Sequence, residues 1–451
     1  MSLKLAVIGA GPAGYPAALT AARLGAEVSV IEPAALGGVC LNSGCIPSKS
    51  LLDAAHRFDA GKSLAALSQT PSEAARPDWS KIRARQQAVT AKLTGGIGVL
   101  FRQAHVEWIK ASASFLDERT LRLQTQEGEK TLPFDYVIVA SGTTAFVPPP
   151  LDKIRERVYD NSTIFGIERL PQTLTIVGGG VIGCEFATLM TSLGVRVHMV
   201  EMQTRLLPNM DESLSRVVLQ NLQKRGVQFF FGKKAADARV ENSGAVLVLD
   251  DGTELRSDAV LAAIGRQCDL TSMHPENAGL SWTRKGLEGV NPHTMQIKER
   301  IYAAGDVTGL SLLAHAASRQ GEVAAANICG RPATYNNDLI PSAVYTTPEI
   351  ASVGLTRAQA QQHGLDIRSR KAFMMANGRA LTMDAPEGFI EIVSDKSSGK
   401  LLGAAVAGPN ASEIIGSFCV ALTAGMTDEQ LKEVVFPHPS VAEAITDALN
   451  K

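Results

Sequence analysis

The chain lacks a long hydrophobic run and any excess of charge of one sign. Its 451 residues carry 44 basic and 45 acidic side chains, a formal net charge of −1, so no charge field favours nucleic acid or an anionic membrane. No apolar run reaches the length of a membrane span, and the first residues show neither a basic leader nor a small-residue cleavage site. We therefore expect a cytoplasmic protein that binds neither nucleic acid nor membrane.

Cysteine is also scarce. The six cysteines are too few and too scattered for a secreted disulfide scaffold, and we assign no residue to a metal site. In a reducing cytosol, a disulfide that persists is more often catalytic than structural. The chain is too long for one ordinary core and indicates about three or four domains.

Two stretches share one pattern: an apolar strand, a glycine loop, a small-residue helix and a second strand that ends on an acid. The first runs from residue 5 through the loop 9–14 to Glu32, and the second from residue 174 through the loop 178–183 to Glu201. Each GxGxxG loop lets the backbone approach a pyrophosphate at a helix N-terminus, and each acid can accept hydrogen bonds from a ribose. One such loop is a weak signal, whereas two complete units are a strong one. We predict two dinucleotide sites; the alternative is two glycine-rich turns in an ordinary α/β sheet.

Cys40 and Cys45 form a CxxxxC pair soon after the first loop. On an ideal helix, Cα atoms five residues apart are separated by about 8 to 9 Å, which exceeds the usual disulfide span. A bridge therefore needs a distorted turn, which Asn42, Ser43 and Gly44 favour. By spacing alone, two unconnected thiols remain an alternative.

The rest of the chain supplies further elements. We expect a helical stretch at about 51–100, β-like segments around 115–132, an apolar strand at 136–139 that ends in small residues, and an exit linker at the prolines 148–150. The segments 259–266 and 301–307 each predict a strand followed by a turn. The first is equally well explained as a buried strand and turn, and Gly305-Asp306 in the second is by itself better explained as an ordinary turn than as a ligand site. From about residue 339 the nucleotide signals stop and a mixed α+β pattern begins.

Together these motifs resemble the flavin-dependent pyridine nucleotide-disulfide oxidoreductases, and within that family most closely the dihydrolipoamide dehydrogenases. The resemblance covers essentially the whole chain. It is carried by the two glycine loops with their acids and by the segments 37–49, 140–142, 305–306, 345–349 and 436–443. It implies an α/β fold of two Rossmann-like dinucleotide-binding domains and an α+β C-terminal dimerisation domain. The implied bounds are an FAD-binding domain at 1–148, an NAD-binding domain at 149–268, a central domain completing the FAD site at 269–338 and an interface domain at 339–451.

The resemblance also implies the cofactors, FAD and NAD. The first loop and Glu32 would hold the adenosine and pyrophosphate of FAD, Asp306 its ribityl chain, and the second loop with Glu201 the nicotinamide dinucleotide. A carboxylate at Glu201 favours NAD because it repels a 2′-phosphate, although Arg205 nearby leaves NADP open. The predicted cofactor-binding residues are Gly9, Gly11, Pro12, Ala13, Gly14, Glu32, Gly38, Lys49, Ala140, Ser141, Gly142, Gly178, Gly180, Gly183, Glu201, Gly265, Arg266, Gly305, Asp306, Ala314 and His315.

The same resemblance assigns the catalytic groups. Cys40 and Cys45 would form the redox disulfide, with Cys40 facing substrate and Cys45 facing the flavin. Lys49 and Glu185 would pair beside the flavin, where a carboxylate neutralises a buried lysine. His438, oriented by Glu443, would act as the base for the dithiol, and the family places this histidine against the disulfide of the other subunit of a homodimer.

The chain departs from the usual family pattern at several positions, among them Val39, Ser43, Ser141, Gln320, Phe436, Ser440 and Ala442. None of these removes a group needed for electron transfer, but they leave the lipoyl-bearing partner open. We expect an enzyme that oxidises a protein-bound dihydrolipoyl group and reduces NAD. The alternatives are an NAD(P)H-dependent reductase of another disulfide or of a metal ion, a soluble transhydrogenase, and a flavin-containing binding protein that does not turn over.

Overall fold

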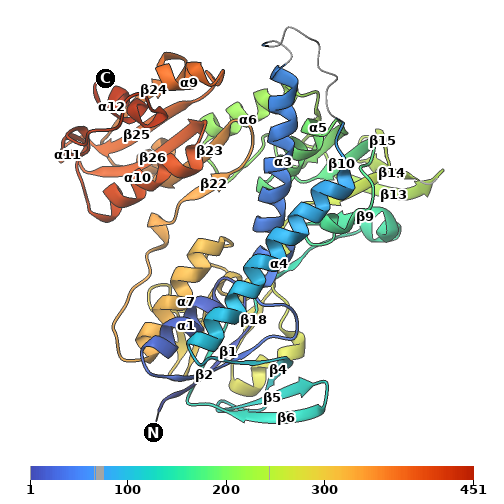
Figure 1. Cartoon of the computed structure of the whole chain (residues 1–451), viewed down its shortest axis with the longest axis vertical. Coiled ribbons are helices and arrows are strands. Elements are labelled where there is room, and N and C mark those ends of the chain that lie inside the picture. The colour runs from blue at the N-terminus through green and yellow to red at the C-terminus, as the bar shows by residue number, and fades with distance from the viewer. Residues whose placement is uncertain (1, 65–66, 68–75, 243) are drawn as a thin grey trace.

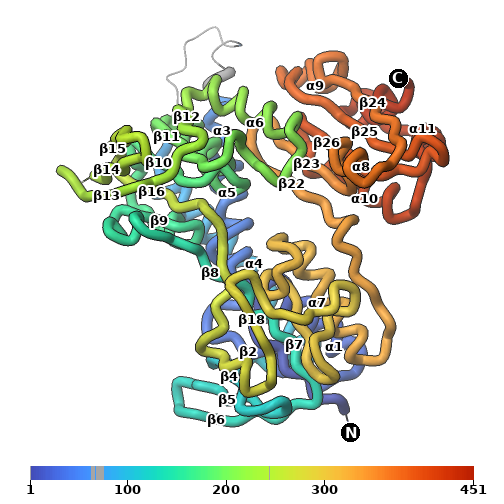
Figure 2. The backbone as a smooth tube through the Cα atoms, turned by 180° about the vertical axis from the view of Figure 1, so that it is seen from behind, coloured from blue at the N-terminus to red at the C-terminus, as the bar shows by residue number. Residues whose placement is uncertain are grey.

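The computed structural model describes residues 2–64, 67, 76–242 and 244–451. These residues form two parallel α/β units and an antiparallel C-terminal unit. In Figures 1 and 2 the first unit lies at the end of the molecule that holds the N-terminus, and the other two lie side by side at the opposite end.

The first unit is built on a six-stranded sheet with the order β20–β21–β7–β1–β2–β3. Its central strand β1 pairs in parallel with β2 on one side and with β7 on the other. One face packs under α1 (Gly14–Arg23) and α7 (Ala314–Ile328), and the other meets the meander β4–β5–β6. The strands are β1 (Lys4–Ile8), β2 (Glu27–Ile31), β3 (Glu107–Ile109), β4 (Ala111–Phe115), β5 (Thr120–Thr125), β6 (Gly128–Pro133), β7 (Tyr136–Val139), β20 (Gln296–Lys298) and β21 (Ile301–Ala303).

The second unit repeats this plan with a five-stranded parallel sheet of order β12–β11–β10–β16–β9. All five residues of the central strand β10 are buried, as expected for a parallel strand that is covered on both faces. The helices are α5 (Val181–Ser192) and α6 (Glu212–Lys224), and the strands are β9 (Val158–Asp160), β10 (Thr173–Val177), β11 (Arg196–Glu201), β12 (Gln228–Phe231) and β16 (Ala259–Ala262), with the added sheet β13 (Ala235–Glu241), β14 (Gly244–Leu249) and β15 (Glu254–Ser257).

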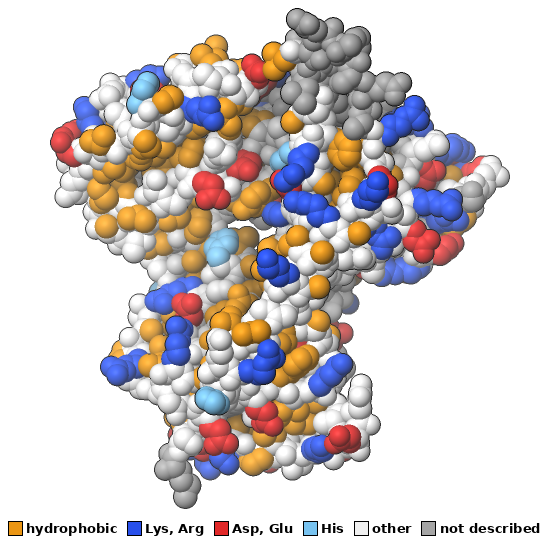
Figure 3. All heavy atoms as spheres, viewed as in Figure 1, with side chains coloured by type: hydrophobic (Ala, Val, Ile, Leu, Met, Phe, Trp, Pro, Cys, Tyr) orange, Lys and Arg blue, Asp and Glu red, His pale blue; other side chains and the backbone are white. Residues whose placement is uncertain are grey.

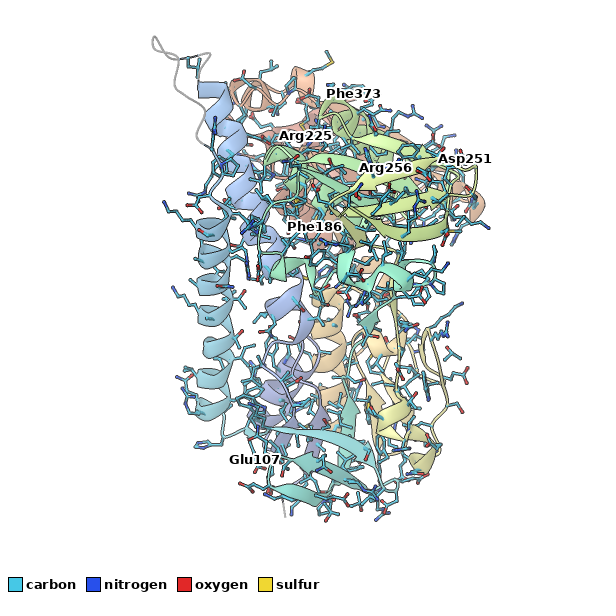
Figure 4. All side chains as sticks on the ribbon, turned by 90° about the vertical axis from the view of Figure 1, so that its right-hand side faces the viewer. Glu107, Phe186, Arg225, Asp251, Arg256 and Phe373 are labelled. Atoms are coloured by element: carbon cyan, nitrogen blue, oxygen red, sulfur yellow. The ribbon has the colours of Figure 1, made fainter. Side chains whose placement is uncertain are left out.

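Two long helices connect the units. After the short helix α2 (Gly38–Ser43), α3 (Cys45–Leu64) and α4 (Trp79–Gln103) run along the side of the molecule. In the side view of Figure 4 they pass from the first unit, marked by Glu107, to the second unit, where Phe186 and Arg225 are labelled. The structure also has two short antiparallel strand pairs: β8 (Thr144–Ala145) with β17 (Arg266–Gln267), and β18 (Trp282–Thr283) with β19 (Gly286–Leu287).

The C-terminal unit is an antiparallel sheet of order β22–β23–β26–β25–β24. Its strands are β22 (Ser342–Val344), β23 (Glu349–Gly354), β24 (Ile367–Phe373), β25 (Phe389–Asp395) and β26 (Leu401–Gly408), and its helices are α8 (Arg357–Gln362), α9 (Gly378–Thr382), α10 (Ala411–Thr423), α11 (Asp428–Lys432) and α12 (Ala444–Leu449). In Figure 3 hydrophobic side chains gather on the surface of this unit. Among the exposed apolar residues are Val420 on α10 and Val435, whose exposed fractions are 69% and 92%.

The fold class predicted from the sequence is confirmed, with two Rossmann-like units and an α+β C-terminal unit. The predicted helical stretch at 51–100 coincides with most of α3 and α4, and part of it, at 65–66 and 68–75, lies outside the described residues. None of the helices in the described part of the chain combines the length and the apolar character that a membrane span requires.

Candidate active site

The first glycine loop closes tightly against the neighbouring strand end. Gly9 has φ +101°, and a Cβ there would lie 2.4 Å from the carbonyl oxygen of Ala140. A Cβ on Gly14 would lie 1.9 Å from the oxygen of Gly9. Helix α1 begins at Gly14 without a side-chain cap, so its first N–H groups point into the loop. Such a cradle fits a pyrophosphate.

Glu32 ends β2 beside this loop. Its carboxylate accepts hydrogen bonds from the backbone N–H of Ala10 at 3.0 Å and of Ala34 at 2.9 Å. These bonds hold the acid over the glycine loop, where an adenosine ribose of FAD would lie.

Asp306 follows β21 and lies in a polar cluster. Its Oδ2 accepts a hydrogen bond from Thr143 Oγ1 at 2.8 Å and lies 3.6 Å from Nε of Arg266. The preceding Gly305 donates its N–H to Oε1 of Gln320 at 2.8 Å. Nη1 of Arg266 is buried and has no hydrogen-bond partner, which fits a polar group of a bound cofactor. Sequence reasoning missed Thr143, although it directly follows the small-residue turn at 140–142.

Most of the remaining residues predicted for FAD surround the first loop. A Cβ on Gly38 would lie 2.6 Å from Cα of Gly11, and one on Gly305 would lie 3.1 Å from Cβ of Ala13. The imidazole of His315, in contrast, donates from Nε2 to the carbonyl of Pro341 at 2.7 Å. The Nε2 atom of His315 is therefore engaged within the same chain.

The second glycine loop repeats the first. Gly178 has φ +110°, and a Cβ there would lie 2.3 Å from the oxygen of Ala263. A Cβ on Gly183 would lie 2.0 Å from the oxygen of Gly178, and α5 likewise begins without a side-chain cap. The second loop therefore fits a second dinucleotide, NAD.

Glu201 is the acid of this loop. It accepts hydrogen bonds from the N–H of Gly179 at 2.6 Å and of Gln203 at 2.7 Å. Arg205, which left NADP open, donates its guanidinium to the carbonyls of Pro208 at 2.6 Å and Met210 at 3.0 Å. Because these bonds hold Arg205 in its own turn, the geometry favours a 2′-hydroxyl, and hence NAD.

The two cysteines meet at a break between helices. Helix α2 ends at Ser43 and α3 begins at Cys45, so the distorted turn expected from the sequence is present. A Cβ on the intervening Gly44 would lie 2.9 Å from the carbonyl oxygen of Val39, which explains the glycine. Both cysteines are free thiols, Cys40 half-buried and Cys45 exposed.

The two sulfurs are electrostatically unequal. Cys40 donates a hydrogen bond to Cys45, and this bond, together with burial, raises the pKa of Cys40 far above its usual range. The same bond is the largest effect on Cys45, whose pKa it lowers to about 7. The charge of Lys49 also lowers this pKa, whereas the surrounding protein and the charge of Glu185 raise it. In the reduced pair Cys45 therefore loses its proton more readily than Cys40 does.

Lys49 and Glu185 form the ion pair that the sequence resemblance implied. Nζ of Lys49 lies 2.8 Å from both carboxylate oxygens of Glu185, whose side chain is only 5% exposed. Tyr345, from the C-terminal unit, donates its N–H to Glu185 Oε1 at 3.1 Å and places its ring 4.5 Å from Nζ. The pair thus joins α3 to α5, and Tyr345 covers it with a cation–π contact. Tyr345 lies in a recognised motif, but sequence reasoning gave it no role.

His438 and Glu443 form a second pair on the C-terminal unit. Nδ1 of His438 lies 2.8 Å from Oε1 of Glu443, and the N–H of Ser440 donates to Oε2 at 2.8 Å. Both bonds lower the pKa of Glu443, and the bond from Ser440 has the larger effect. The His438 side chain is 82% exposed. Among the described residues, no hydrogen bond or ion pair connects this pair to Cys40 or Cys45 of the same chain.

Two family models match the chain. The model of the pyridine nucleotide-disulphide oxidoreductases matches residues 3–321, and that of the dimerisation domain of the same family matches residues 340–449. The second match supports a homodimer.

Known proteins resemble the chain over its whole length. A dihydrolipoyl dehydrogenase of Bacillus subtilis is 35% identical over 451 residues, covering 99% of this chain and 98% of the relative. One of Haloferax volcanii is 36% identical over 456 residues, covering 99% and 95%. Among solved structures, LpdA from Mycobacterium tuberculosis superposes with a TM-score of 0.93 at 27% identity, covering 99% of each chain. The HOCl-induced flavoprotein disulfide reductase RclA from Escherichia coli superposes with a TM-score of 0.87 at 26% identity, also covering 99% of each chain.

Proposed function

Because the chain belongs to the pyridine nucleotide-disulphide oxidoreductases, whose members use FAD and NAD, we propose that it oxidises the dihydrolipoyl group of a carrier protein and reduces NAD. The observation that carries this proposal is the unequal cysteine pair at the helix break, in which the pKa of Cys45, four residues before Lys49 on α3, is lowered and that of Cys40 is raised. A dithiol substrate needs such an asymmetry, because one sulfur must accept the substrate while the other leaves.

The proposed reaction begins with the oxidised pair. His438 takes a proton from one substrate thiol, and the resulting thiolate attacks Sγ of Cys40, so that the bond between Cys40 and Cys45 breaks and Cys45 leaves as a thiolate. The second substrate thiol loses its proton to water and attacks the substrate sulfur bound to Cys40. The lipoyl ring closes, and Cys40 leaves with the proton returned by His438. The substrate has lost two electrons, and the cysteine pair has gained them.

The other site residues support this sequence by position and charge. Glu443 would hold the imidazole and stabilise its cationic form, and the charge of Lys49, balanced by Glu185, would favour the Cys45 thiolate. The two glycine loops with Glu32 and Glu201 would hold FAD and NAD. FAD, when bound, supplies the two-electron chemistry that links the dithiol to NAD.

We assign the domains as FAD-binding at 1–148, NAD-binding at 149–268, central at 269–338 and interface at 339–451. The pairing of β21 with β7 supports a central segment that completes the first unit. His438 would act on the cysteine pair of the other subunit, which its exposure supports. The substrate would be a lipoyl-bearing protein of the cytoplasm, where thiols outside the active site stay reduced.

The first test is spectroscopic. Anaerobic addition of dihydrolipoamide to the holoenzyme should produce a long-wavelength absorbance band from a thiolate beside the flavin. Cys45→Ser should abolish this band. Its matched control, Cys40→Ser, should retain it, because Cys45 remains. A band that persists in Cys45→Ser would refute the assignment of the two sulfurs.

The second test is turnover. The proposal predicts fast oxidation of dihydrolipoamide with NAD and little reduction of glutathione disulfide with NADPH. The reverse ratio would favour a reductase of another disulfide, a possibility that the similarity to RclA keeps open. Complete flavin reduction without repeated turnover would instead favour a flavin-containing binding protein.

A further inference from the structure

His438 lies on a segment without regular structure, whereas Glu443 ends the short 3-10 helix Val441–Glu443, whose capping box joins Glu443 to Ser440. Residues 434–440 form neither helix nor strand, and the His438 side chain is 82% exposed. A general base must be held within hydrogen-bond reach of the proton that it removes. If His438 serves as the proposed base, the contacts that hold this segment, of which the capping box is one, decide where the imidazole lies.

One buried side chain bonds the segment from outside. Asn377 precedes α9 and is 3% exposed. Its Nδ2 donates a hydrogen bond to the carbonyl of Ser440 at 3.1 Å, and its Oδ1 accepts one from the N–H of Ala380 at 2.9 Å. The amide therefore connects α9 to the loop that carries the base.

The bond to Ser440 continues directly to the imidazole. The N–H of Ser440 donates to Oε2 of Glu443 at 2.8 Å, and Oε1 of Glu443 lies 2.8 Å from Nδ1 of His438. Both backbone groups of Ser440 are thus used, the carbonyl by Asn377 and the N–H by Glu443. Three successive hydrogen bonds lead from a buried amide to the exposed base.

A helix cap alone does not explain this residue. Asn, Asp, Ser and Thr all cap helix N-termini well through a side-chain oxygen. Of these, only Asn offers a separate N–H donor in addition to the capping oxygen. At Asn377 the oxygen serves the cap and the N–H serves the Ser440 carbonyl. The second bond lies outside the cap and joins α9 to the segment that contains Ser440.

We infer that Asn377 is a positioning residue for the His438–Glu443 pair, acting through Ser440. This inference rests on the proposed role of His438 in dithiol oxidation. It predicts that loss of the Nδ2 donor slows the reaction with the dithiol while leaving electron transfer from NADH unchanged.

The test uses two variants that keep the cap and remove the donor, Asn377→Asp and Asn377→Ser. A displacement of about 1 Å in a catalytic group can cost about 100-fold in rate, and we expect flavin reduction by dihydrolipoamide in stopped-flow experiments to slow by about 10-fold or more. NADH-dependent reduction of an artificial dye, which does not require the base, should stay at the wild-type rate. The matched control is Thr356→Ala, which removes the capping oxygen of α8 in the same unit and should change neither rate.

The outcomes separate the inference from the function on which it rests. Wild-type dithiol rates in both Asn377 variants, beside a slow His438→Gln, would overturn the inference alone. Equal losses in the dithiol and dye reactions would also overturn it, because they indicate a general structural defect. A His438→Gln variant with the wild-type dithiol rate would refute the base assignment, and the inference with it.

Discussion

Replacing Lys49 by Met should raise the pKa of Cys45, whereas replacing Glu185 by Gln should lower it, although both changes break the same ion pair. The hydrogen bond from Cys40 has the largest effect on the pKa of Cys45, which lies at about 7. The positive Lys49 lowers this pKa, and the negative Glu185 raises it. A purely structural role of the pair would not produce opposite signs.

The size of the effect follows from the geometry. Lys49 stands four residues after Cys45 on α3, so the two side chains lie on one face of the helix. At a separation of about 6 Å, close to the Cβ spacing of such a pair, two unit charges interact by about 3 kcal/mol at an effective dielectric of about 20. The Lys49 side chain is 31% exposed, so solvent screening reduces this to about one pKa unit, about 1.4 kcal/mol. At pH 7 the thiolate fraction of Cys45 should then fall from about one half to about one tenth in Lys49→Met and rise to about nine tenths in Glu185→Gln.

The assay is a pH titration of the anaerobically reduced holoenzyme, followed by thiolate absorbance. Lys81→Met is the matched control, since it removes a lysine on α4 that is 85% exposed and forms an ion pair with Asp78. The reasoning would be refuted if both variants moved the Cys45 pKa in the same direction, or if the control moved it as far as Lys49→Met did.

Three further predictions concern the helix break, the cofactor acid and the core of the C-terminal unit. Gly44→Ala should push against the Val39 carbonyl, 2.9 Å from the new Cβ, and prevent oxidative closure of the cysteine pair, as a thiol titration after mild oxidation would reveal. Glu201→Gln should lower the preference for NAD over NADP by about 10-fold, because it removes the repulsion between the carboxylate and a 2′-phosphate, which we take as about 1.4 kcal/mol. The ratio of kcat/KM values for the two cofactors measures this preference. Asp428→Ala should destabilise the protein by about 3 kcal/mol in urea unfolding, because it leaves the guanidinium of Arg370, now 2.6 Å from a 2% exposed carboxylate, without its partner.

The nucleotide loops could be predicted because their constraints are local. A GxGxxG loop after an apolar strand needs glycine where the backbone closes on its neighbour, as at Gly9 and Gly178, and an acid such as Glu32 at the end of the next strand. The unusual turn between Cys40 and Cys45 followed from helix geometry in the same way. The Lys49–Glu185 pair, separated by 136 residues, came from family resemblance alone.

Contacts between distant segments with no periodic signal could not be predicted. Tyr345 reaches Lys49 only because the C-terminal sheet packs beside α3 and α5, and no pattern around Tyr345 encodes that packing. Thr143 meets Asp306 through the parallel register of β7 and β21. Asn377 precedes a five-residue helix and resembles any other cap in the sequence, so its second hydrogen bond becomes visible only in three dimensions.

The C-terminal unit faces two directions. Through Tyr345 it touches the ion pair of its own chain, and through His438 it offers a base to the outside. If that base serves another subunit, a single folded chain holds cysteines without a base and a base without cysteines. Specific activity would then obey mass action between subunits, so that dilution would lower it. Mixing a subunit that lacks the base with one that lacks the thiols would restore one working centre per pair.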